Sequence, residues 1–226
     1  FDKHNYITEN FIQKTQQYDQ YWVIPNYSND IHFYKSLCRD DAKVHTAPYV
    51  WNTDILNIYT KNNDISWSIN KNSKEKYIII AEPNMQITKN CLIPLLICND
   101  LYTVDQNIKV MVLCKPGTKA FEIFCKNLQI HQDNKVEYYP RIKFYEVLRQ
   151  LKEKQSDVFI LSHHKDNPLN FLHLETLFIN YPLIHNCERY TNAGYYYKTI
   201  QQASLKLREA MMIHANNINN YKQKIS

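Results

Sequence analysis

The pattern of hydrophobic positions is most regular over residues 76–226. Short apolar runs rich in β-branched residues alternate there with amphipathic stretches whose apolar positions recur every three or four residues. Strands that are apolar on both faces, each followed by a helix, are typical of a parallel sheet covered by helices. We therefore predict an α/β fold, a Rossmann-like parallel sheet with helices on both faces and right-handed crossovers.

The elements of this sheet can be placed from the same pattern. The predicted strands are residues 76–81, 109–115, 135–139, 157–162 and 182–186, and the predicted helices are 88–102, 119–128, 143–154, 169–180 and 202–224. Pro94 lies inside the first helical pattern, and we interpret it as a kink. The last helix should bury a stripe at helical spacing, formed by Leu205, Leu207, Ala210, Met211, Ala215, Ile218 and Tyr221.

The N-terminal part has a different pattern. Residues 20–25 and 43–50 have strand character, with a helix near 32–38 between them. Two strands and one helix cannot bury their own apolar surface, so we expect residues 1–60 to be the end of a truncated first domain. Residues 61–75 are polar and rich in Asn, Lys and Ser, which is typical of a linker.

Composition excludes several classes of function. Gly117 and Gly194 are the only glycines, so neither a GxGxxG nor a Walker-type phosphate loop can be written. The six cysteines have no metal-ligand spacing, and we interpret them as reduced thiols. No apolar run reaches the roughly 20 residues of a membrane span. We therefore expect a cytoplasmic protein; the abundant Asn, Ile, Lys and Tyr hint at a viral genome expressed in an infected host cell.

The loop after the fourth predicted strand, residues 162–170, holds the densest group of polar side chains. Loops at the carboxyl ends of parallel strands form the ligand crevice of such sheets. Asn167 followed by Pro168 has the form of a helix N-cap and its first helical residue. Backbone amides at a helix start, together with the helix dipole, form an anion site without any glycine. Glu175 lies about two turns further along.

Seven residues separate Asn167 from Glu175, and Pro182 then begins a strand. This pattern resembles the E-x7-E helix of retaining GT-B glycosyltransferases. In that family the second glutamate binds the ribose hydroxyls of the sugar nucleotide, and amides at the helix start hold the donor. The resemblance gives Glu175 the ribose role and puts Asn167 at the first acidic position, with Asp166 one residue earlier. More narrowly, residues 81–102, 166–186 and 192–197 look like an uncharacterised bacterial or viral glycosyltransferase-like family.

The resemblance implies a donor-binding set spread over three loops. Glu82 and Lys89 follow the first strand, where a basic residue meets the pyrophosphate in that family. Pro140 and Arg141 follow the third strand, beside the nucleotide base. The loop and helix after the fourth strand contribute His164, Asp166, Asn167, Pro168, Leu169, Asn170 and Glu175. Plainer alternatives stay open: Glu175 as a solvated helix residue, and Lys89 as a surface lysine.

The implied function is transfer of a sugar from a nucleotide-diphosphate donor to an unknown acceptor, a glycan or a protein-linked glycan. Residues 76–226 would bind the donor, and residues 1–60 would end the acceptor-side domain. The adjacent histidines 163 and 164 have no third ligand, and the chain contains no Asp-x-Asp, so we expect neither a metal nor a cofactor. The catalytic base and the oligomeric state are not assigned.

Two alternatives to this function remain. The first is a non-catalytic module of the same fold that binds a nucleotide sugar or a partner, which the missing first acidic residue favours. The second is a sugar transferase acting on DNA. The net charge of +5 permits that acceptor, but no basic-aromatic stripe supports a nucleic-acid partner.

Overall fold

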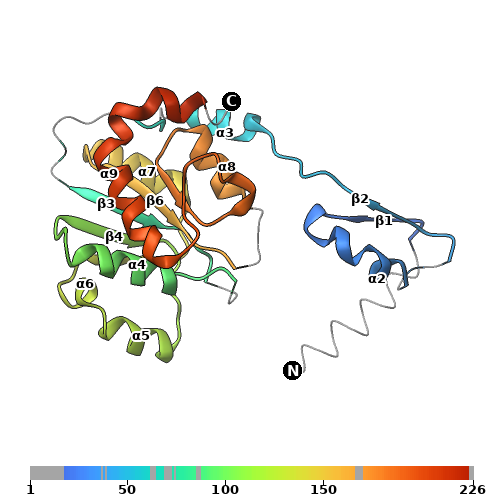
Figure 1. Cartoon of the computed structure of the whole chain (residues 1–226), viewed down its shortest axis with the longest axis horizontal. Coiled ribbons are helices and arrows are strands. Elements are labelled where there is room, and N and C mark those ends of the chain that lie inside the picture. The colour runs from blue at the N-terminus through green and yellow to red at the C-terminus, as the bar shows by residue number, and fades with distance from the viewer. Residues whose placement is uncertain are drawn as a thin grey trace. The chain divides into compact units, whose positions relative to one another are not determined.

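A computed structural model of the chain describes residues 18–36, 38, 40–61, 65–68, 73, 75–84, 88–165 and 170–223 (Figure 1). The chain divides into two compact units, Phe1–Asn52 and Thr53–Ser226. The helix α3 (Thr53–Lys61), which the pattern had not indicated, therefore groups with the second unit. The expected roles of residues 1–60, 61–75 and 76–226 stay predictions.

The first unit contains the predicted strands and helix. The strands β1 (Gln20–Val23) and β2 (Lys43–Thr46) pair in parallel, joined through the 3-10 helix η1 (Pro25–Asp30) and the helix α2 (Ile31–Ser36). Large apolar side chains stay exposed, among them Trp22 at 69% and Phe33 at 59%. So small a group of elements cannot enclose its own apolar surface, as expected from its size.

The second unit confirms the predicted fold class. Its strands are β3 (Lys76–Ile80), β4 (Ile108–Val112), β5 (Val136–Tyr138), β6 (Asp157–Ser162), β7 (Leu183–His185) and β8 (Tyr195–Tyr196). They form one parallel sheet in the order β5-β4-β3-β6-β7-β8. The two-residue strand β8 was not predicted, because two residues cannot show a period. The turn before it contains Gly194 at φ 67°, a left-handed conformation that glycine adopts without strain.

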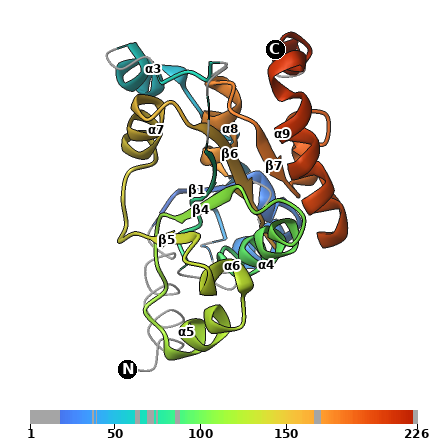
Figure 2. The same ribbon diagram turned by 90° about the vertical axis from the view of Figure 1, so that its left-hand side faces the viewer.

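Helices cover both faces of this sheet. The helices of the second unit are α3, α4 (Leu92–Tyr102), α5 (Lys119–Lys126), α6 (Gln129–Gln132), α7 (Phe144–Glu153), α8 (Phe171–Phe178), the 3-10 helix η2 (Glu188–Tyr190) and α9 (Ile200–Gln223). The helices α4 and α9 pack side by side on one face, and α7 and α8 cover the other (Figure 2). The central strands are therefore apolar on both sides, and Ile78, Val110 and Ile160 are fully buried.

Three details of the predicted helices were wrong. Pro94 is no kink: α4 begins at Leu92, so Pro94 lies in the first turn, where a missing N–H removes no helical hydrogen bond. In α9, Leu205 is 65% exposed instead of buried. The buried stripe instead includes Ala203 and His214, because α9 is oriented by the groups that His214 reaches, Asn180 and Tyr195.

The order of the strands fixes where a ligand can lie. From β3 the chain proceeds outward through β4 and β5, whereas from β6 it proceeds in the opposite direction through β7 and β8. β3 and β6 are direct neighbours, with Ile78 opposite Phe159. Loops that leave two such strands diverge and open a crevice at their carboxyl ends. The loops after Ile80 and Ser162 therefore border the expected ligand site.

Candidate functional site

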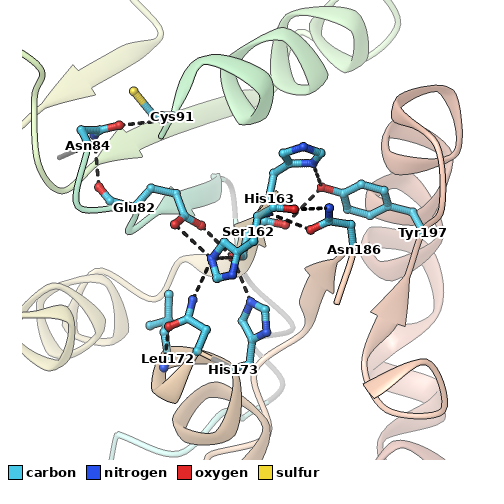
Figure 3. Close-up of polar contacts among 11 residues, drawn as sticks. Glu82, Asn84, Cys91, Ser162, His163, Leu172, His173, Asn186 and Tyr197 are labelled. Carbon is cyan, nitrogen blue, oxygen red and sulfur yellow. Dashed lines mark hydrogen bonds and ion pairs between the residues drawn. The ribbon is translucent and has the colours of Figure 1, made fainter. Parts of the chain in front are cut away.

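A buried polar cluster occupies this switch point. Glu82, two residues beyond β3, is 1% exposed, and Ser162 at the end of β6 is fully buried. The Ser162 hydroxyl donates to Glu82 Oε1 at 2.7 Å, and His164 Nε2 lies 3.1 Å from Glu82 Oε2 (Figure 3). A buried carboxylate is costly unless it is paired and hydrogen-bonded, and here both of its oxygens have partners.

His164 is the centre of the cluster. Its Nε2 lies 3.0 Å from Ser162 Oγ and 2.9 Å from Asn170 Nδ2. Its ring also stacks on that of His173, with centroids 4.9 Å apart. The backbone of His164 is held by Asn186, whose side chain accepts from its N–H at 2.9 Å and donates to its carbonyl at 2.7 Å. Position and orientation of this imidazole are therefore fixed from two strands and one helix.

His173 closes the cluster from α8. Its Nε2 lies 2.9 Å from Ser162 Oγ, while its buried Nδ1 has no hydrogen-bond partner. Burial holds the pKa of His173 well below its usual value, and His185, His164 and Lys89 lower the pKa further. The ring is therefore neutral, with its proton on Nε2, because an unpaired buried N–H costs more than an unpaired lone pair.

His163 points away from its neighbour. Its Nδ1 lies 2.9 Å from the Tyr197 hydroxyl, which donates to the Ser162 carbonyl (Figure 3). Burial lowers the pKa of His163, and the nearby His164 lowers it too. Across the described residues, no three His, Cys, Asp or Glu side chains are grouped as metal ligands.

Lys89 joins the same site through its backbone. It forms an isolated antiparallel bridge with His164, and Lys165 N–H donates to the Thr88 carbonyl at 3.0 Å. The loops that carry Lys89 and Lys165 therefore pair through their backbones beside the buried cluster. Asn84, at φ 55°, holds the loop after β3 against the start of α4, because its side-chain oxygen accepts a hydrogen bond from Cys91 N–H.

The start of α8 differs from the prediction. The helix begins at Phe171 and is capped by Asn170, whose Oδ1 accepts from Leu172 N–H at 3.2 Å, so the cap predicted at Asn167 was wrong. Both asparagines suit a cap, and the contact of Asn170 with His164 selects the later one. The expected donor residues Asp166, Asn167, Pro168 and Leu169 lie outside the described residues.

Glu175 lies on the second turn of α8 and is half-buried. Burial raises the pKa of this carboxyl, and a hydrogen bond from Tyr145 lowers it. Tyr145 is the second residue of α7, just after the loop that carries Pro140 and Arg141. That loop is bonded to the one after β4 through Lys115 N–H and the Tyr139 carbonyl, at 2.9 Å.

The expected residues therefore fall into two groups. Glu82, Lys89, His164 and Asn170 are brought together at the switch point, whereas no described hydrogen bond links Glu175, Pro140 or Arg141 to them. Ser162, His173 and Asn186 belong to the cluster but were not in the expected set. A polar residue at the end of each central strand is the signal that could have shown Ser162 and Asn186.

A separate cavity of about 400 Å³ lies between α9 and the segment 191–196. None of the expected donor residues lines it. Among the helices described, none is both long and apolar enough to cross a membrane.

Solved glycosyltransferase structures share this fold. TarM superposes with a TM-score of 0.59 at 13% identity, over 96% of this chain and 42% of TarM. The pneumococcal O-GlcNAc transferase GtfA, solved with UDP and GlcNAc, gives 0.57 at 10% identity over 98% of this chain and 44% of GtfA. The C-terminal domain of the group 1 glycosyl transferase LpcC from Francisella tularensis gives a TM-score of 0.52 at 12% identity, over 74% of this chain and 89% of the LpcC domain.

These likenesses show the fold: the sheet matches the Rossmann-like C-terminal domain of GT-B glycosyltransferases. The chain spans less than half the length of TarM and of GtfA. No curated protein sequence matches it significantly. One family model covers residues 1–226, and by that match the chain belongs to the family described as protein of unknown function, DUF2827.

Proposed function

We propose that this chain carries the donor-binding part of a glycosyltransferase that uses a nucleotide-diphosphate sugar. The observation that carries the proposal is the meeting of Glu82, His164, Asn170 and Lys89 at the switch point. That is where open parallel sheets bind their ligands. The fold is shared with glycosyltransferases, one of which was solved with UDP and GlcNAc.

The charges at this edge of the sheet suit a diphosphate. Lys89 and Lys165 belong to the paired loops next to His164, which contacts Asn170 at the start of α8, and Lys89 is near enough to lower the pKa of His173 in that helix. The dipole of a helix favours an anion at its start. The carboxylate nearest to them, Glu82, is 1% exposed and engaged by Ser162. Lysines and amides aimed at the leaving diphosphate stabilise the charge that develops there during transfer.

Glu175 is the proposed partner of the ribose. A half-buried carboxylate can accept from both ribose hydroxyls, and such charge-assisted hydrogen bonds belong to the stronger class. Its neighbour Tyr145 follows the loop of Pro140 and Arg141. In this arrangement the base of the nucleotide lies against that loop, and the sugar points towards His164 and the acceptor.

The test is the affinity of Glu175→Gln for the best donor, found by screening UDP-, GDP- and TDP-sugars. A hydrogen bond to a charged group contributes roughly 1.5–3 kcal/mol, so the variant should bind about ten-fold or more weakly in calorimetric titration. Glu122→Gln, on the exposed surface of α5, is the matched control and should bind as wild type does. Equal affinity of Glu175→Gln and wild type would show that the ribose site lies elsewhere.

We also propose that donor binding needs no metal. If amides and lysines hold the diphosphate, EDTA should leave the affinity unchanged within error. A loss of about ten-fold or more (about 1.4 kcal/mol), restored by Mn²⁺ or Mg²⁺, would contradict this. Slow hydrolysis of the bound donor would support an enzyme, whereas binding without any turnover would favour a non-catalytic module.

A further inference from the structure

The cavity between α9 and residues 191–196 is a part of the second unit that the proposed donor site does not use. Its volume of about 400 Å³ lies within the roughly 300–1,000 Å³ of small-molecule sites. Most backbone groups of a helix are bonded internally, so the residues of α9 line the cavity mainly with their side chains. These residues are Lys206, Glu209, Asn217, Asn220 and Tyr221.

The two asparagines of the cavity have hydrogen-bonding capacity left over. Asn220 Nδ2 donates to Asn217 Oδ1 at 3.5 Å, a long contact at the limit of a hydrogen bond. Within the described chain, no hydrogen bond involves the NH₂ group of Asn217 or Oδ1 of Asn220. Tyr196 of the edge strand β8 also lines the cavity, and edge strands present unpaired backbone N–H and C=O groups. The cavity therefore offers a ligand both donors and acceptors.

The two charged residues of the cavity balance each other. Lys206 Nζ lies 2.6 Å from Glu209 Oε2, with the two side chains 40% and 39% exposed. This pairing leaves no excess of positive charge to hold a phosphate, so a neutral ligand is favoured over an anion. The ammonium group has further protons, and the carboxylate has a second oxygen, which hydroxyl groups of a ligand can contact.

Two stacked tyrosines form the apolar part of the cavity. The rings of Tyr195 and Tyr221 have centroids 5.8 Å apart, and these residues are 7% and 5% exposed. The Tyr195 hydroxyl lies 3.1 Å from His214 Nδ1, and the Tyr221 hydroxyl donates to the Tyr181 carbonyl at 2.7 Å. Because both hydroxyls are engaged inside the fold, the two side chains offer the cavity ring atoms only.

We propose that this cavity binds a neutral sugar ring, either free or as one unit of a glycan. A sugar ring has C–H groups that pack against aromatic rings, and hydroxyls that each donate and accept. The tyrosine rings, the asparagine amides and the Lys206–Glu209 pair supply the matching groups. An apolar ligand would leave these polar groups without partners, which is costly. The proposal goes beyond the donor site and does not depend on it, since none of the expected donor residues lines the cavity.

The experiment is NMR of the full chain titrated with glucose, maltose, N-acetylglucosamine and chitobiose. Asn217→Ala and Asn220→Ala assign the two side-chain NH₂ signals by their loss. At least one sugar should shift both signals in wild type, saturably and with millimolar affinity. Each variant should bind that sugar about three- to ten-fold more weakly, because a hydrogen bond between neutral groups is lost. The matched controls Asn216→Ala and Asn219→Ala, exposed on α9 outside the cavity, should bind as wild type does.

Alanine favours helices, so all four variants should keep α9 folded. The absence of a saturable shift with every sugar would overturn the proposal, as would wild-type affinity in both Asn217→Ala and Asn220→Ala. Stronger binding of inorganic phosphate or UDP at these signals would overturn the neutral class of ligand. Sugars should bind equally with and without UDP, and a failure of UDP to bind would count against the donor site alone. Tighter binding of a disaccharide than of its monosaccharide would identify a glycan as the source, and equal affinity a free sugar.

Discussion

The acid–base pairs at the amino ends of the strands differ in character from the pair at their carboxyl ends. We call these two sides of the sheet the amino edge and the carboxyl edge. At the amino edge, Lys109 Nζ lies 2.5 Å from Glu75 Oε1 and Lys76 Nζ 2.8 Å from Asp105 Oδ2, with these side chains 25–44% exposed. At the carboxyl edge, Glu82 and His164 have side chains that are 1% and 3% exposed. Water and salt screen the outer pairs, which contribute about 0–1 kcal/mol each.

The difference teaches where to look for function. A buried acid–base pair stabilises poorly, because desolvating the charges costs about as much as their attraction returns. Removing one partner is nevertheless costly, since the other is left without its contacts. Titratable groups that are buried together in a crevice are therefore a better sign of a functional site than well-formed ion pairs on the surface.

The largest effect on stability should come from lowering the pH, because the buried histidines and the exposed ion pairs should lose their contributions at different pH values. Burial lowers the pKa of His173, and that of His185 and His214 to about 4. These histidines therefore stay neutral in the folded protein at pH values below about 6.5, at which they are protonated in the unfolded chain. Stability should thus be complete above about pH 6.5 and fall towards pH 4, by about 3 kcal/mol for each of His185 and His214.

Urea unfolding between pH 8 and pH 4 measures this loss. The pKa of Glu75 and Asp105 is lowered by their lysine partners, so the amino edge should lose stability only below the ordinary values of 4.5 and 3.8. His185→Gln should make the dependence above pH 4 shallower. Constant stability from pH 8 to pH 5 would show that these histidines are not kept neutral by the fold.

A smaller effect is expected for two serines, one at each edge. The Ser162 hydroxyl contacts Glu82, His164 and His173, all buried. Ser162→Ala leaves buried polar groups unsatisfied and should cost about 2–3 kcal/mol of unfolding free energy. Ser73 accepts from Asp157 N–H at 3.0 Å in a partly exposed position, and Ser73→Ala should cost less than about 1 kcal/mol. Equal costs in urea titration would remove the contrast between the edges.

The smallest effect should be that of the outer ion pair. Lys109→Met removes the lysine partner of Glu75 but leaves that carboxylate accessible to water and 3.2 Å from the Tyr77 hydroxyl. The cost should be about 0.2–1 kcal/mol and should shrink further in about 0.5 M salt. Denaturant unfolding at low and high salt measures it. A loss of several kcal/mol that persists in salt would mean that this pair behaves like the buried one.

Much of the fold could be predicted from local pattern alone. The strand predicted at 157–162 matches β6 from end to end, because its apolar run is bounded by polar residues on both sides. Parallel order follows from the alternation of strands and helices. Within the site, the loop after β6 and the residues Glu82, Lys89, His164 and Asn170 were expected, because polar residues beyond the ends of parallel strands lie at one edge.

The start of α8 marks the limit of that approach. Asn167 followed by Pro168 is a strong local signal for a cap, and Asn170 is an equally good capping residue. The choice depends on His164, which reaches Asn170 only once β6 and α8 have packed together. The burial of His214 in α9 was missed for the same kind of reason, since its partners Asn180 and Tyr195 lie 34 and 19 residues away.

The sequence by itself determined the class of fold, five of the six strands of the sheet (β3 to β7), the helices α4, α5, α7, α8 and α9, and the end of the strands at which we expect a ligand. These depend on periodicity and on the carboxyl ends of the strands, which are local properties of the chain. Only the tertiary structure decided the order β5-β4-β3-β6-β7-β8 and the cluster of Glu82, Ser162, His164 and His173. Glu82 and Ser162 are 80 residues apart, and their contact exists because β3 and β6 are neighbours at the point where the strand order reverses.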